Sequence, residues 1–88
     1  MKGYELFKIL GEETRFEIVR FLANVKERTC AELSEKFPHL SQPTLSHHFK
    51  VLADADVILV KKKGTAHSYS LNRALLEKAG VALVKGNI

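Results

Sequence analysis

The sequence is short of the residues that hold small secreted domains together and of those that cross membranes. Cys30 is the only cysteine among the 88 residues, so no disulfide can form within the chain. No apolar stretch is long enough for a membrane helix or for the apolar part of a signal peptide. We therefore expect a single domain, residues 1–88, in the reducing cytoplasm.

Net charge is lacking in the first half of the chain. Residues 1–40 hold seven Lys/Arg and seven Asp/Glu, whereas residues 41–88 hold seven Lys/Arg against three Asp/Glu. The formal net charge of +4 therefore lies entirely in residues 41–88. This asymmetry favours an anionic partner for the second half over a role in solubility alone.

Patterns typical of catalysis and of metal binding are lacking as well. Ser46 and His47 are adjacent, but consecutive side chains of a helix do not face one another, so they form no catalytic dyad. We expect neither an enzyme nor a bound metal or other cofactor, although an intermolecular disulfide or an adduct at the cysteine is an alternative. The possible metal ligands lack a structural-zinc spacing; they are Cys30, His39, His47, His48 and His67.

What the sequence does contain is a stretch, residues 41–52, with two contrasting faces. At about 100° per residue, Leu45, Phe49 and Leu52 fall on one apolar stripe. Ser41 can cap the start of such a helix. Pro43 suits its first turn, where a missing N–H group costs little. The pattern predicts a helix that is anchored in a core along one side.

The opposite side of this helix is polar, and we interpret it as a DNA-recognition surface. Short donors and acceptors point outward there, and the free N–H groups and dipole of the helix N-terminus favour a phosphate. His48 borders the apolar stripe, so we expect it to pack rather than to contact DNA. A merely solvated helix face is the alternative. The predicted DNA contacts of this helix are Ser41, Gln42, Thr44, Ser46, His47 and Lys50.

Two further helices are predicted before this stretch. Apolar residues recur at helical spacing within residues 12–23, which indicates a core helix. Thr29 and Glu32 have the spacing of a capping box, in which each side chain bonds the other residue's N–H group. A short helix should therefore start at Thr29 and end before Pro38. Together with residues 41–52 it makes a helix-turn-helix.

A β-hairpin is predicted after the recognition helix. Residues 57–60 are rich in β-branched side chains, residues 66–71 alternate, and Gly64 stands between them at the turn, with three lysines at its shoulder. A charged hairpin beside a recognition helix is typical of a wing whose cations reach phosphates. A solvated hairpin that discourages edge pairing is the alternative. The predicted wing contacts are Lys61, Lys62, Lys63 and Thr65.

The terminal helices, about residues 2–10 and 73–84, carry more apolar surface than so small a core can use. Asn72 can cap the second of them. Because a chain of this length buries only about 60% of its unfolded surface, pairing across a twofold axis would help. The fold class is mainly α with a small β-hairpin, in the order α-α-α-α-β-β-α. The predicted dimer-interface residues are Leu6, Phe7, Leu10, Leu76, Ala79 and Leu83.

Four segments, in this order, resemble the ArsR family of winged helix-turn-helix transcriptional repressors. The match is nearly continuous over residues 40–52, and residues 10–16, residues 31–34 and the hairpin support it. The hairpin positions concerned are Gly64, Tyr69 and Leu71. The resemblance implies a homodimer, formed by the terminal helices, that binds an inverted repeat in promoter DNA and is released by a signal.

Two features depart from the family pattern. Metal-sensing members place two cysteines around the start of the helix before the recognition helix; Thr29 and Ala31 stand at those positions here, with Cys30 between them. The turn at residues 37–40 is one residue longer than the common form and has Pro38 in place of the usual glycine. We therefore predict a sequence-specific repressor without that metal site. The alternatives are a winged-helix module for protein interaction and a metal- or thiol-responsive repressor of the same fold.

Overall fold

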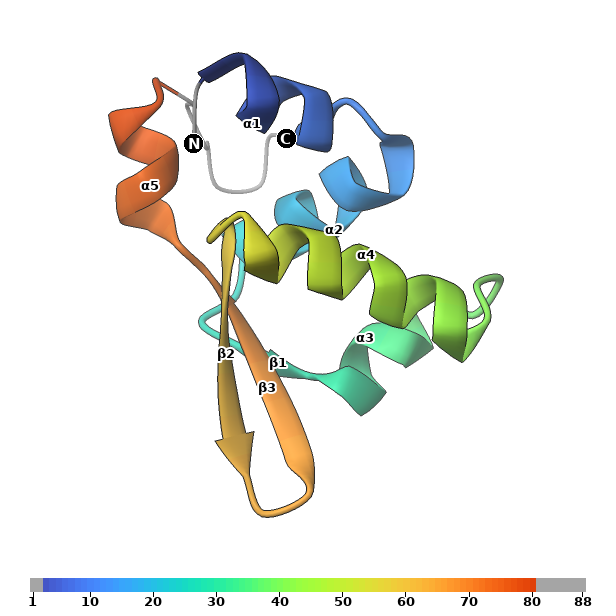
Figure 1. The fold of residues 1–88 in the computed structure, drawn as a ribbon. Coiled ribbons are helices and arrows are strands. Elements are labelled where there is room, and N and C mark those ends of the chain that lie inside the picture. Colours follow the sequence, from blue (N-terminus) through green and yellow to red (C-terminus); the bar gives the residue numbers. More distant parts are fainter. Residues whose placement is uncertain (1–2, 81–88) are drawn as a thin grey trace.

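Five helices and three strands make up residues 3–80, the part of the chain that the computed structural model describes (Figure 1). The helices are α1 (Gly3–Leu10), α2 (Glu13–Ala23), α3 (Cys30–Lys36), α4 (Gln42–Asp54) and α5 (Arg73–Lys78). The strands are β1 (Arg28–Thr29), β2 (Ile58–Lys63) and β3 (Ala66–Leu71). The predicted winged helix-turn-helix fold is confirmed, and its order differs from the predicted one only by the added strand β1. Helix α4 crosses the middle of the molecule, α3 lies below it, and the β2–β3 hairpin projects away from the helices (Figure 1).

Strand β1 is an element that the sequence did not indicate. It pairs antiparallel with β3, Arg28 opposite Tyr69 and Thr29 opposite Ser68, so the strand order is β1-β3-β2. Two residues are too few for an alternating pattern, which is why the sequence held no signal for this strand. Its pairing brings the start of α3 next to the hairpin.

The three lysines, predicted at the shoulder of the turn, are the last residues of β2 and lead directly into it. The ladder continues to the pair Lys63–Ala66, which leaves only Gly64 and Thr65 as the loop. Gly64 has φ +61°, the positive value that a tight two-residue hairpin requires at its first loop position. Because side chains alternate along a strand, Lys61 and Lys62 point to opposite faces.

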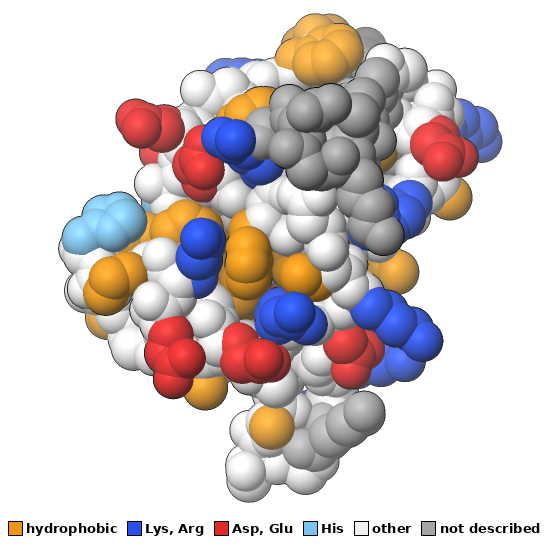
Figure 2. All heavy atoms as spheres, turned by 180° about the vertical axis from the view of Figure 1, so that it is seen from behind, with side chains coloured by type: hydrophobic (Ala, Val, Ile, Leu, Met, Phe, Trp, Pro, Cys, Tyr) orange, Lys and Arg blue, Asp and Glu red, His pale blue; other side chains and the backbone are white. Residues whose placement is uncertain are grey.

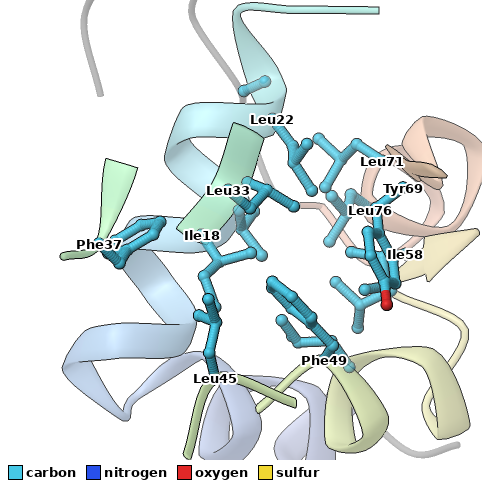
Figure 3. Close-up of a cluster of buried hydrophobic side chains, with 14 of the residues drawn as sticks. Ile18, Leu22, Leu33, Phe37, Leu45, Phe49, Ile58, Tyr69, Leu71 and Leu76 are labelled. Carbon is cyan, nitrogen blue, oxygen red and sulfur yellow. The ribbon is translucent and has the colours of Figure 1, made fainter. Parts of the chain in front are cut away.

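The apolar stripe of α4 is buried, as predicted. Leu45, Phe49 and Leu52 are 1%, 3% and 0% exposed. Figure 3 shows Leu45 and Phe49 pointing from α4 into a cluster that includes side chains of α2, α3 and the hairpin. The rings of Phe49 and Tyr69 lie 4.6 Å apart between centroids. Burial of each such side chain contributes about 1.5–3 kcal/mol, so this stripe fixes α4 to the body of the domain.

The helix caps follow the sequence closely. The Thr29 N–H group donates to Oε1 of Glu32 at 2.9 Å, and the Glu32 N–H group donates to Oγ1 of Thr29 at 3.2 Å, which confirms the capping box. Ser41 caps α4 and Asn72 caps α5, both as predicted. At the start of α2 the cap is Glu12, whose carboxylate accepts from the Arg15 N–H group at 2.9 Å.

The terminal helices differ from the expectation in length and in what they expose. Helix α5 ends at Lys78, because Gly80 adopts φ +79° and its N–H group turns back to the Glu77 carbonyl. Leu6 and Leu76 were expected at a dimer interface, but they belong to the hydrophobic core of this chain. Their side chains are 1% and 0% exposed, so they offer almost no surface to a partner. The other predicted interface residues are distributed as follows: Leu10 and Ala79 are partly buried, Phe7 is 58% exposed, and Leu83 lies outside the described residues.

Candidate nucleic-acid interface

The polar side of α4 faces solvent. Ser46 and His47 are both exposed, on the side of the helix away from the buried stripe. Ser46 is a short donor and acceptor, and His47 presents an imidazole with two ring nitrogens. Both can bond the edges of base pairs in a major groove, which an α-helix is narrow enough to enter.

The predicted contacts at the N-terminus of α4 also form hydrogen bonds within the domain. The Ser41 hydroxyl donates to Oγ1 of Thr44 at 2.9 Å and accepts from the Thr44 N–H group at 3.3 Å. Nε2 of Gln42 donates to the Ser34 hydroxyl in α3 at 2.9 Å. These exposed side chains therefore set the start of α4 and its approach to α3. Sequence reasoning missed the role of Ser34, since Gln42 could have met any residue of the preceding helix.

Lys50, the cation of this surface, lies beside an acid. Its Nζ is 3.0 Å from Oδ2 of Asp54, one turn along the helix, and the two side chains are 74% and 65% exposed. An ion pair this exposed contributes little, about 0–1 kcal/mol, so a phosphate can compete for the ammonium group. The four-residue spacing was visible in the sequence, but Asp54 was not considered there.

A groove separates α4 from the wing and brings His67 into the candidate interface. Its volume is about 320 Å³, and Ser46 and Lys50 line it together with His67 of β3. His67 is exposed and pairs with Lys62 in the hairpin register, so the two side chains share one face of the sheet. In the sequence His67 stood out only as a possible metal ligand, and it was not predicted as a DNA contact.

The wing presents the remaining predicted contacts. Lys61, Lys62 and Thr65 are exposed; Lys63 belongs to β2, and its side chain lies outside the described part of the structure. Thr65 lines a second open groove, of about 550 Å³, beside Cys30 at the start of α3. On the face opposite that of Figure 1, acidic and basic side chains lie interspersed instead of forming a patch of one sign (Figure 2).

His48 packs at the edge of the core, as predicted from its position beside the stripe. Its side chain is only 12% exposed and lies between α4 and the start of α2. Burial lowers the pKa of His48 from its usual 6.5, the Glu12 carboxylate raises it, and Arg15 and His47 lower it further. The pKa of Glu12 is lowered from 4.5, chiefly because its carboxylate accepts from the Arg15 backbone. At neutral pH we therefore take His48 as uncharged and Glu12 as ionised.

Metal ligands do not gather within residues 3–80. Over that range no group of three or more His, Cys, Asp or Glu side chains is placed to hold an ion. At the start of α3, Cys30 is partly buried between Thr29 and Ala31. In the same part of the chain, no helix has the length and apolar character needed to span a bilayer.

Comparison with known sequences also identifies a helix-turn-helix protein. A family model described as a helix-turn-helix domain matches residues 10–61, from the end of α1 into β2. The arsenical resistance operon repressor of Staphylococcus aureus is 42% identical over 72 residues, which cover 82% of this chain and 67% of that protein. The transcriptional repressor SdpR of Bacillus subtilis is 35% identical over 72 residues, 82% of this chain and 78% of that protein.

A second protein of Bacillus subtilis, also named arsenical resistance operon repressor, is 38% identical over 73 residues, which cover 82% of this chain and 69% of that protein. These matches extend over most of the chain and include the helix-turn-helix, so they confirm the resemblance identified from the sequence. The chain therefore belongs to the ArsR family of winged helix-turn-helix transcriptional repressors, which are DNA-binding proteins and not enzymes.

Proposed function

We propose that the protein represses transcription as a homodimer that binds an inverted repeat in promoter DNA, with one α4 helix of each subunit in the major groove. The observation that carries the proposal is the division of α4 into two sides. Its apolar stripe is buried, whereas Ser46 and His47 are exposed on the other side. A helix held in this way presents the same side chains to DNA in every complex.

The wing supplies contacts that do not depend on sequence. Lys61, Lys62 and Thr65 lie on a hairpin that projects beside α4, where cations can approach the phosphates flanking the groove. His67 and Lys50 face the groove between the two elements and extend this polar surface. We assign base reading to α4 and phosphate binding to the wing and to the N-terminus of α4.

The proposed subunit interface centres on α1. Tyr4 and Phe7 both lie on this helix, and their side chains are 67% and 58% exposed. Two large apolar side chains this exposed on one short helix indicate an interaction surface. A twofold axis beside α1 would cover both rings in both subunits. Two α4 helices related by such an axis should enter successive major grooves about 34 Å apart.

Selection of bound duplexes from a random pool tests this proposal. We expect an imperfect palindrome whose half-sites are separated by about 10 base pairs, with an affinity for the selected duplex about 10³-fold or more above that for random duplex. Failure to enrich any sequence would contradict base reading by α4. Weak binding of all duplexes, with tight binding of an acidic protein, would instead support a module for protein interaction.

A further inference from the structure

Two charged side chains from the start of α2 flank His48 of the recognition helix. Nδ1 of His48 lies 3.4 Å from Nη1 of Arg15 and 3.7 Å from Oε2 of Glu12. The imidazole is 12% exposed and the Glu12 side chain 37%, so these contacts are partly shielded from water. A hydrogen bond in such a place is stronger than one on the surface, and its loss leaves buried polar groups unpaired.

The same guanidinium also reaches α1. Nε of Arg15 donates to the carbonyl oxygen of Ile9 at 2.8 Å, so one side chain on α2 joins the last turn of α1 to α4. A guanidinium group donates from a rigid plane and accepts nothing. Arg15 can donate to Nδ1 of His48 only in the tautomer that carries its proton on Nε2, and we assign that tautomer to His48.

This contact restrains a motion that the apolar core does not. The stripe formed by Leu45, Phe49 and Leu52 resists separation of α4 from the domain, but dispersion contacts are not directional and tolerate small rotations. His48 lies about 60° from Leu45 around the helix, on the flank that faces α2. The contact between the tilted rings of Phe49 and Tyr69 holds the side toward the wing. Together the two contacts define the rotation of α4 about its own axis.

We propose that Arg15 is a positioning residue for DNA recognition, which joins Ile9 of α1 to His48 of α4. It thereby fixes the direction in which Ser46 and His47 point. Arg15 itself touches no DNA and acts only through His48. This inference rests on the proposed reading of DNA by α4.

Acid should break this contact. The charged and titratable groups that face His48 are Glu12 and Arg15 from α2 and His47 from its own helix. When His48 takes up a proton, Nδ1–H can only donate, and the ring is then repelled by Arg15 and attracted to Glu12. Because the pKa of His48 lies below its usual 6.5, the imidazole becomes charged only in acid solution. The preference for one DNA sequence should therefore decrease as the pH is lowered through that range.

The test is the ratio of two affinities, one for the duplex that the wild-type protein selects from a random pool and one for random duplex. We expect Arg15→Lys, which keeps the charge but cannot bridge two acceptors in the same plane, to lower this ratio at least about tenfold at neutral pH. His48→Asn keeps an acceptor near the position of Nδ1. It should retain the ratio and make it depend less on pH between about 5 and 8 than in the wild type, because His47 and His67 remain at the proposed DNA surface.

Arg20→Gln is the matched control, because Arg20 lies on the same helix and its only ion pair is with Glu17 of that helix, at 3.6 Å, within the described residues. It should leave the ratio unchanged, and melting temperatures of all variants identify any general loss of folding. An unchanged ratio in Arg15→Lys, or the same pH profile in the wild type and His48→Asn, would overturn the role of Arg15 alone. A wild-type protein without any preference would overturn the proposed function together with this role.

Discussion

Asp56 occupies a backbone conformation that an L-residue adopts at a cost. It has φ +60°, directly after the C-cap of α4, where its own N–H group and that of Val57 return to the Ala53 and Leu52 carbonyls. This arrangement at a helix end usually contains glycine. A carboxylate there also meets the negative end of the helix dipole. The conformation and the charge both disfavour aspartate at this position.

We expect Asp56→Gly to raise the free energy of unfolding by about 1 kcal/mol in urea denaturation. Asp56→Asn removes the charge and keeps a side chain, so it should give only the smaller electrostatic part of the gain. A glycine variant less stable than the wild type would show that the aspartate side chain makes a contact that offsets its backbone strain.

His48 should make stability depend on pH. Burial lowers its pKa in the folded state below the usual 6.5, so the unfolded chain binds the proton more readily. The contribution of neutral His48 is therefore complete above about pH 6.5 and is lost as the pH falls. Glu12, whose lowered pKa starts from 4.5, adds a further loss only in more acid solution. The two groups act in separate windows.

Urea denaturation between about pH 5 and 8 checks this expectation. The free energy of unfolding should decrease from neutral pH downward in the wild type, and the decrease should be smaller in His48→Asn. Parallel curves for the two proteins would mean that the folded-state pKa of His48 is not lowered.

For single residues, the sequence predicts contacts between residues that are close along the chain, but not contacts between residues that are far apart along it. The caps at Thr29, Ser41 and Asn72 were identified because each depends on residues within one helical turn. Arg15 and His48 are 33 residues apart, and only the packing of α2 on α4 brings them together. No local spacing could have indicated that contact.

At the scale of elements, the lysines of the wing lie on two different faces of the hairpin, whereas the prediction from sequence grouped them as one set of phosphate contacts. Lys62 is opposite His67, on the sheet face that continues toward the groove lined by α4, whereas Lys61 is opposite Ser68 on the other face. Both ammonium groups are exposed. If the wing approaches DNA together with α4, the lysine on the groove side is the better placed of the two for phosphate contact.

We therefore expect Lys62→Gln to weaken binding to all duplexes and to make the slope of log affinity against log salt less steep by up to about 0.9. Lys61→Gln, which removes the same charge from the same strand, is the matched control and should change the slope less. Equal effects of the two variants would contradict a sided approach, and no effect of either would remove these two lysines from the interface.

The limits of the hairpin could not be obtained from composition. Lysine has little preference for strands, so the run of three suggested the end of a strand. Pairing with β3 carries β2 through these residues to Lys63, and β3 is in turn completed by β1. The buried stripe of α4, by contrast, was predicted fully because its signal is a helical period within one segment.

At the scale of the whole molecule, the sequence indicated excess apolar surface on the terminal helices but not which residues carry it. The core takes Leu6 and Leu76, and the aromatic side chains of α1 remain outside it. A helical pattern shows which residues share a face, whereas the boundary between core and surface depends on how α1 and α5 meet the other helices. The proposed dimer therefore depends on Tyr4 and Phe7.

We expect Phe7→Glu to give monomers in sedimentation equilibrium, because a charge at a 58% exposed ring would be buried in the proposed interface. The loss of one half of the assembly should also reduce affinity for a two-half-site duplex to that for a single half-site. Leu59→Glu places the same charge at a 49% exposed side chain of the hairpin and should leave the oligomeric state unchanged. A dimeric Phe7→Glu variant would place the interface elsewhere.

Selection from a random pool, carried out in parallel with the wild-type protein and with His47→Ala, tests most directly whether the exposed side of α4 reads bases. The variant should lose its preference, by about 1–3 kcal/mol, at one base-pair position in each half-site and keep the remaining positions. Identical selected sequences for the two proteins would contradict base reading by His47. Weaker binding of the variant on every sequence alike would make it a phosphate contact.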